Sequence, residues 1–135
     1  MQFIGLYREL GRDISDQVRS IREDIGFIEH EIAEKIASYL ASGIPVLDSM
    51  EATIDPLDKS VFTPGGSSLL SDGFWVWRYD LAYLIVKYRL RLPEQFIQHA
   101  IEKRIVDPNI ESKILQHVHE AVSYTHLTLP TIYSV

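Results

Sequence analysis

One dipeptide, Asp72-Gly73, constrains the fold of this chain more than any other feature. An Asp-Gly pair suits a two-residue type I′ turn, in which both residues adopt positive φ. We therefore predict a β-hairpin that joins a strand at 67–71 to a strand at 74–78. Side chains alternate between the two faces of a strand, and here both faces are apolar: Trp75 and Trp77 on one, Phe74 and Val76 on the other. Because neither face is polar, we expect a helix to cover at least one of them.

Helical periodicity dominates the chain on both sides of this hairpin. Apolar residues recur at steps of three and four over 25–40, which predicts the strongest helix, and Gly43 follows as a stop. Shorter helices are expected before it, over 3–10 and 18–25. After the hairpin three more helices are expected, and these begin at Asp80, at Pro93 and at Asp107-Pro108.

The segment 44–54 has the composition of a strand, and part of it alternates apolar with polar residues. Pro45 suits the start or the edge of that strand. A further short strand is expected at Val61-Phe62. The order of helices, strands and helices predicts an α+β fold. We expect a small antiparallel sheet, with strands near 44–54, 67–71 and 74–78, packed by N-terminal and C-terminal helices.

The charge balance limits the class of partner. The chain has 19 Asp and Glu against 13 Lys and Arg, a formal charge of −6, and no cysteine. General binders of nucleic acid or anionic membranes depend on clustered Lys and Arg, so neither partner is expected. The missing cysteines exclude disulfides, thiolate metal sites and cysteine nucleophiles. With no signal-peptide pattern, and no apolar run longer than 81–86, we expect a cytoplasmic protein.

The last part of the sequence differs from the rest. Every charged residue lies within 1–121, and the segment 122–131 reads VSYTHLTLPT. Residues 122–135 resemble the conceptual translation of a transposase-type sequencing adapter. We therefore interpret 1–120 as a single α+β domain that is interrupted before its true C-terminus, and 121–135 as a non-native tail. The alternative is an ordinary threonine-rich strand.

The block 71–99 reads SDGFWVWRYDLAYLIVKYRLRLPEQFIQH. It resembles the pattern DGxWxW…DLAYxxxxY…LPxxFxxH of a family of small uncharacterised bacterial proteins. It departs from that pattern at Leu84, where a second Tyr is common, and at Arg78, where Pro is common. The resemblance implies a bacterial origin and a context of mobile elements or toxin–immunity loci. It implies no catalytic residue, since no established activity comes with the family. The matching positions are Asp72, Gly73, Trp75, Trp77, Asp80, Leu81, Ala82, Tyr83, Val86, Tyr88, Leu90, Leu92, Pro93, Phe96 and His99.

An aromatic stripe supplies the first candidate site. Trp and Tyr anchor many protein interfaces, because they bury a large area at a low cost in entropy. The alternative is core packing beneath helices, with the indole N–H groups bonded to carbonyl oxygens. An exposed Trp would favour the interface. The candidate interaction residues are Trp75, Trp77, Tyr79, Tyr83 and Tyr88.

Asp80 and His99 form the second candidate, as an acid–base pair across two helices. The alternative is a helix cap for Asp80 and a partly exposed helix position for His99. His117 and His119 are two residues apart and lie on different faces of a helix, and no HExxH spacing exists. The glycine-rich segment 63–68 lacks the lysine of a phosphate-binding loop. No metal or cofactor is therefore expected.

A group of acidic residues completes the candidates: Glu23, Asp24, Glu29, Glu31 and Glu34. They form either a solvated helix face or a surface for a basic partner. The leading hypothesis is a non-enzymatic protein-interaction domain with a protein partner, such as an immunity-type inhibitor or a phage or mobile-element accessory protein. The alternatives are a small enzyme that uses Asp80 and His99, and a subunit of a larger assembly. The oligomeric state is left open.

Overall fold

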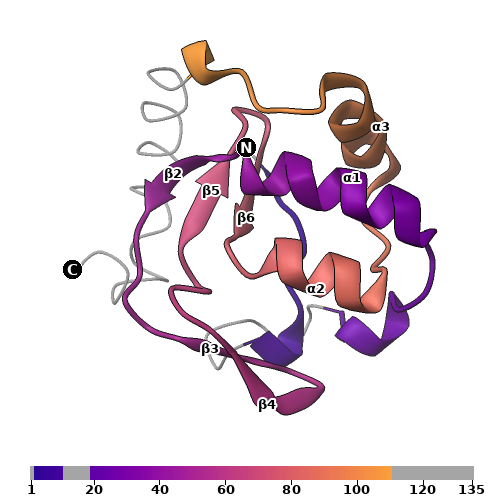
Figure 1. Ribbon diagram of the computed structural model, residues 1–135, viewed down its shortest axis with the longest axis vertical. Coiled ribbons are helices and arrows are strands. Elements are labelled where there is room, and N and C mark those ends of the chain that lie inside the picture. The colour runs from indigo at the N-terminus through magenta and orange to yellow at the C-terminus, as the bar shows by residue number, and fades with distance from the viewer. Residues whose placement is uncertain (1, 11–18, 111–135) are drawn as a thin grey trace.

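The computed structural model describes residues 2–10 and 19–110, which form three α-helices, six strands and three short 3-10 turns (Figure 1). The expected continuation of the last helix beyond 110 and the segment 121–135 lie outside the described residues. The predicted α+β class is confirmed. The strands are β1 (Gln2–Phe3), β2 (Ile44–Leu47), β3 (Thr53–Asp55), β4 (Asp58–Thr63), β5 (Leu69–Ser71) and β6 (Trp75–Arg78). The helices are α1 (His30–Ala41), α2 (Leu81–Tyr88) and α3 (Glu94–Lys103), and the 3-10 turns are η1 (Arg8–Leu10), η2 (Ile21–Glu23) and η3 (Pro108–Ile110).

The larger sheet has the strand order β1-β6-β5-β2. The predicted hairpin is confirmed as β5 and β6, which run antiparallel with Leu70 opposite Trp77. The strand β2 is antiparallel to β5. The strand β1 was not predicted, and it adds to the other edge, parallel to β6. The sheet is therefore mixed, with an antiparallel centre.

The turn of this hairpin differs from the predicted type I′ geometry. Gly73 has a positive φ of 95°, but Asp72 is not among the residues with positive φ. Instead, one carboxylate oxygen of Asp72 accepts hydrogen bonds from the backbone N–H groups of Phe74 and Trp75, at 2.9 and 2.8 Å. The side chain of Asp72 thus closes a longer turn, which is a common role for aspartate.

The single strand predicted over 44–54 is wrong, because the segment divides between two sheets. The strand β2 belongs to the larger sheet, whereas β3 pairs only with β4 in a separate hairpin that includes the predicted Val61-Phe62 strand. Between β2 and β3 the chain is held by Ser49, whose backbone N–H donates to Ser68 Oγ at 2.9 Å. Beyond this contact the chain leaves the larger sheet, and β3 and β4 lie at the lower end of the molecule in Figure 1.

The helices expected near the N-terminus are also wrong. The segment 3–10 contributes to β1 and to η1, and the described part of 18–25 contains only η2. The backbone N–H of Ile4 donates to the carbonyl of Val76 at 3.0 Å, so pairing with β6 replaces the local helical pattern. The helix predicted over 25–40 begins later, at His30, after Gly26 adopts a positive φ of 79°.

The core lies between the larger sheet and the helices. Leu70 and Trp77 face α1, α2 and α3, and the three helices gather on one side of the sheet in Figure 1. The expectation that a helix covers one face of β6 is therefore confirmed. Leu69 and Val76 point to the opposite face, where Ile110 packs against them. The largest fully buried side chains include Trp77, Tyr39, Phe96, Ile21, Ile36, Leu40, Leu81, Leu84, Ile85 and Leu90.

Candidate functional site

The two tryptophans of the aromatic stripe face the helices. Trp77 is completely buried, and its indole N–H donates to the carbonyl oxygen of Leu40 at 3.1 Å. Trp75 is half-buried, and its ring lies nearly perpendicular to that of Phe96 with the ring centroids 5.2 Å apart. Trp77 is thus a core residue, as the alternative interpretation of the stripe expected, and its ring offers no surface to a partner.

Tyr83 and Tyr88 lie on α2, and both hydroxyl groups donate to the carboxylate of Asp55, at 2.7 and 2.6 Å. The ammonium of Lys87 binds the same carboxylate at 2.8 Å. Burial acts to raise the pKa of Asp55, but the hydrogen bonds from Lys87, Tyr88 and Tyr83 outweigh it and hold that pKa far below its usual value. Burial, and then the bond to Asp55, raise the pKa of Tyr88 to about 12. This cluster fixes the β3–β4 hairpin to α2.

Asp80 stands at the first position before α2, but its side chain makes no capping bond. Its carboxylate accepts instead from the guanidinium of Arg78 and from the hydroxyl of Thr53, both at 2.9 Å. Burial raises the pKa of Asp80 despite the positive charge of Arg78. Within the described residues, the other oxygen of Asp80 and Nε of Arg78 have no hydrogen-bond partner. The carboxylate therefore joins β3 to β6, and the expected side-chain cap is not formed.

His99 lies on α3 with about a quarter of its side chain exposed, and its Nε2 is 3.8 Å from a carboxylate oxygen of Asp72. Asp72 precedes β6 and Asp80 follows it, so the whole strand, about 3.3 Å per residue, separates the two carboxylates. The rings around His99 are those of Tyr39, Phe74 and Trp75. The structure thus places Asp80 and His99 in different networks at opposite ends of β6.

Buried aspartates bonded to tyrosine hydroxyls recur through the fold. Tyr7 donates to Asp24 at 2.9 Å and Tyr39 donates to Asp72 at 2.6 Å, in addition to the pair of tyrosines on Asp55. Burial is the main cause that raises the pKa values of Tyr7 and Tyr39 well above their usual range. Of the five acidic candidate residues, Asp24 is therefore buried and cannot contribute to an acidic surface. The other four, Glu23, Glu29, Glu31 and Glu34, are exposed.

Sequence reasoning missed Tyr7, Tyr39, Asp55 and Lys87. The spacing of Tyr83 and Lys87, four residues apart on one helix, was visible as a neighbouring pair. Their shared partner Asp55 lies on β3, about 30 residues earlier in the sequence. A local sequence pattern does not predict a contact between residues so far apart.

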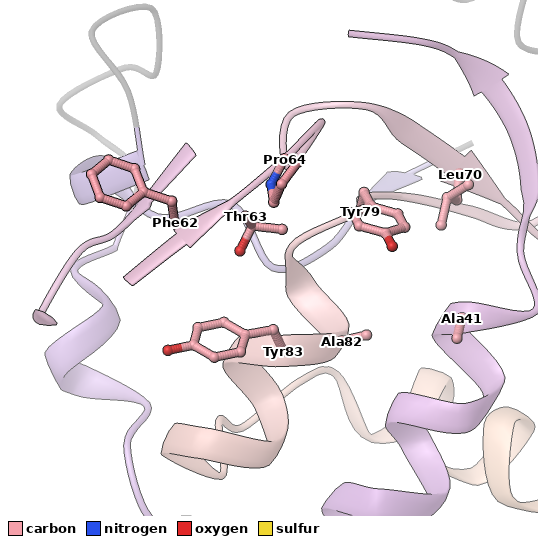
Figure 2. Close-up of a pocket in the computed structure, with 8 residues that line it drawn as sticks. All are labelled: Ala41, Phe62, Thr63, Pro64, Leu70, Tyr79, Ala82 and Tyr83. Atoms are coloured by element: carbon pink, nitrogen blue, oxygen red, sulfur yellow. The ribbon is translucent and has the colours of Figure 1, made fainter. Parts of the chain in front are cut away.

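Tyr79 is the member of the stripe that remains most accessible, with 51% of its surface exposed. Its ring borders a pocket of about 400 Å³ between the β3–β4 hairpin, α2 and the end of α1. In Figure 2, Thr63 and Pro64 lie above this pocket, Ala82 and Tyr83 lie below it, and Phe62 points away at one end. No side chain that lines it carries a formal charge: Ala41, Phe62, Thr63, Pro64, Leu70, Tyr79, Ala82 and Tyr83.

Exposed apolar side chains continue from this pocket onto the hairpin. Phe62 is 60% exposed, and its cross-strand neighbour Ile54 is 49% exposed. Met50 is 96% exposed on the loop before β3, which Ser49 anchors to the chain beside the pocket. We call these residues the hairpin surface: Met50, Ile54, Phe62 and Tyr79 together with the pocket.

Comparisons with known proteins returned nothing: no family model, curated protein or solved structure matches this chain. Within residues 2–10 and 19–110, no group of three or more His, Asp or Glu side chains is placed to hold a metal ion. Across the same residues, none of the helices has the length and hydrophobicity needed to cross a bilayer.

Proposed function

We propose that this chain is a protein-interaction domain without catalytic activity, and that it binds its partner through the hairpin surface. The observation that carries the proposal is an uncharged pocket with exposed Tyr79 and Phe62 at its edges. Contiguous exposed apolar groups mark interaction sites on soluble proteins. A pocket beside an accessible tyrosine is typical of the anchor points that contribute most binding energy at interfaces.

The electrostatics of the fold support binding rather than acid–base chemistry. The buried carboxylates of Asp24, Asp55, Asp72 and Asp80 are each engaged by tyrosine, arginine, lysine or threonine side chains. None of these carboxylates lines the pocket. A general acid or base needs to reach a substrate. These four carboxylates instead bind side chains of other elements inside the fold, so they are poorly placed for that role.

A finer proposal follows from the resemblance of the block 71–99. We propose an immunity-type inhibitor or a phage or mobile-element accessory protein. The formal charge of −6 supports this class, because acidic inhibitors associate rapidly with basic enzymes through charge complementarity. An inhibitor of this kind would bind one specific protein partner.

Photocrosslinking in bacterial cells tests the proposal. The photoreactive p-benzoylphenylalanine is introduced at Tyr79 and, as a matched control, at Phe27, which is 57% exposed and contacts the far end of α2. We expect one protein to be captured through position 79 and not through position 27. The purified partner should then bind the wild-type chain, and Tyr79→Ser should weaken that binding by about thirtyfold, as loss of a 2 kcal/mol anchor does.

Two results would contradict the proposal. Equal capture through positions 79 and 27 would show that the hairpin surface has no preferred partner. A captured protein that binds Tyr79→Ser as tightly as the wild-type chain would place the interface elsewhere. Capture of a second copy of the chain through position 79 would favour the alternative of a subunit in a larger assembly.

A further inference from the structure

We infer that the hairpin surface recognises a partner segment in which one large apolar side chain is flanked by basic residues. This inference rests on the proposed function and deepens it. The pocket volume of about 400 Å³ lies near the lower end of the range of about 300–1,000 Å³ that is usual for small-ligand sites. This volume admits one large side chain with its neighbouring groups at the opening, and it excludes a whole helix or strand.

The lining determines the character of that side chain. Ala41, Leu70 and Ala82 present aliphatic groups, and Ala82 points into the space in Figure 2. The aromatic rings of Tyr79 and Tyr83 border the same space. An apolar or aromatic side chain gains free energy from this surface, whereas a charged one would lose hydration without gaining a countercharge.

Charges beside the pocket determine what should flank the anchor. Residues 48–63 contain four carboxylates and one lysine, and one of the four, Asp55, is buried and paired with Lys87. Asp48 and Glu51 are exposed on either side of Met50, and neither forms a salt bridge among the described residues. Asp58 is partly exposed and shares Lys87 with Asp55. Basic residues beside the anchor therefore meet a surface of opposite charge.

The exposed rings strengthen this preference. Arginine and lysine are attracted to the faces of aromatic rings, and Phe62 and Tyr79 each leave about half or more of their surface accessible. This domain already uses such contacts, since the guanidinium of Arg91 lies 4.7 Å from the ring centroid of Phe27. A basic, apolar segment thus matches both the charge and the ring surface beside the pocket.

Three blocked tripeptides test the inference on the full chain: acetyl-Lys-Phe-Lys-amide, acetyl-Glu-Phe-Glu-amide and acetyl-Lys-Gly-Lys-amide. Binding is followed by backbone amide NMR shifts at Thr63, Tyr79 and Ala82. We expect the basic phenylalanine peptide to bind at least about fivefold more tightly than the acidic one, from two exposed ion pairs. The glycine peptide should cause no shifts at the pocket.

The salt dependence is a second test of the same inference. Raising the ionic strength from about 0.01 M to about 1 M should remove the difference in affinity between the basic and the acidic phenylalanine peptides, because the Debye length falls from about 30 Å to about 3 Å.

Charge variants locate the effect. Neutralising the loop with Asp48→Asn and Glu51→Gln together should reduce the preference for the basic peptide by about twofold or more. The matched control, Glu29→Gln with Glu31→Gln, has the same net charge but lies at the far end of α1 from Ala41. It should leave the preference unchanged. If both double variants lost the preference for the basic peptide equally, the preference would depend on the overall charge of the chain, and the inference would be overturned.

The outcomes separate this inference from the proposed function. If both phenylalanine peptides shift the pocket signals with equal affinity, the pocket binds apolar groups but the basic partner is wrong. If none of the peptides shifts these signals and crosslinking through position 79 captures nothing, the proposed function itself fails. If the signals shift when the protein alone is concentrated, the occupant is a second copy of the chain, and the inference is overturned.

Discussion

The two sheets of this domain are stabilised by different forces. The larger sheet is packed by three helices around Trp77, Tyr39 and Phe96, all of which are buried. The β3–β4 hairpin pairs with no strand of that sheet, and it is joined to the rest of the fold mainly by polar side chains, above all by Asp55. Two of its apolar residues, Ile54 and Phe62, face outward, whereas Leu57 in its turn packs against the core.

This difference explains where binding is expected. The buried apolar side chains of the larger sheet, such as Leu70 and Trp77, contribute to stability, so they are not available to a partner. Because Asp55 and Leu57 position the hairpin, Ile54 and Phe62 are not needed to hold it in place, and they can remain exposed for recognition. The following experiments test whether the two regions are separable in this way.

Replacing Trp77 should have the largest effect on the fold. Trp77→Ala removes a completely buried indole and its bond to Leu40, and should lower the free energy of unfolding by about 3–5 kcal/mol. Urea denaturation followed by circular dichroism measures this change, with Phe27→Ala as the exposed aromatic control. A loss below about 1 kcal/mol would show that the larger sheet does not depend on this packing.

Removing the carboxylate of Asp55 should have a smaller effect, concentrated on the hairpin. Asp55→Ala leaves Tyr83 and Tyr88 without their acceptor. Because both tyrosines are partly exposed and water can replace part of each bond, we expect the total loss to be about 1.5–3 kcal/mol. Amide hydrogen exchange should increase across 53–63 while the protection of β5 and β6 is kept. Equal loss of protection in both sheets would show that the hairpin and the core unfold as one unit.

The contrast also explains what the sequence could predict. The hairpin of β5 and β6, helix α1 and the α+β class follow from alternation and helical spacing, which reflect burial of apolar faces. Pocket residue Tyr79 was identified among five aromatic candidates, but only the tertiary structure separates it from Trp77. The side-chain partners of Asp55, namely Tyr83, Lys87 and Tyr88, are 28 to 33 residues away along the chain, so a local pattern does not predict these contacts.

The N-terminal segment shows the same limit. Phe3 and Tyr7 match a helical spacing, yet Ile4 bonds to β6 and Tyr7 bonds to Asp24. A pairing partner more than seventy residues away overrides the local pattern. Likewise, Asp80 has the position of a helix cap, but Arg78 and Thr53 compete successfully for its carboxylate.

Acidification should distinguish the carboxylates of Asp55 and Asp80, because their pKa values are shifted in opposite directions. The pKa of Asp80 is raised by burial, whereas hydrogen bonds from Lys87, Tyr88 and Tyr83 lower that of Asp55 in spite of its burial. Asp80 should therefore protonate at a pH above about 3.9, the ordinary value, and Asp55 only well below it. Carboxyl carbon NMR shifts measure the order of these titrations, and the reverse order would contradict the bonding described here.

The two carboxylates therefore change the free energy of unfolding in opposite directions as the pH falls. The contribution of Asp55 is complete above about pH 3.9 and is lost as the pH falls toward its depressed folded value. For Asp80, whose folded pKa is raised, proton uptake favours the folded state as the pH falls through that raised value. Asp55→Asn should therefore reduce the loss of stability below pH 4, as urea denaturation at a series of pH values would show.

Tyr79 should have the smallest effect on stability and a large effect on binding. Its ring is half exposed, and no hydrogen bond of its hydroxyl is seen among the described residues, so Tyr79→Ser should change the free energy of unfolding by no more than about 0.5 kcal/mol. Tyr79→Phe keeps the ring and should retain partner binding, because the ring surface and not the hydroxyl forms the edge of the pocket. Thermal denaturation measures the first effect and titration calorimetry with the crosslinked partner measures the second. If Tyr79→Ser destabilised the chain as strongly as Trp77→Ala, both aromatic residues would belong to one core, and the separation between a packed sheet and a recognition hairpin would not hold.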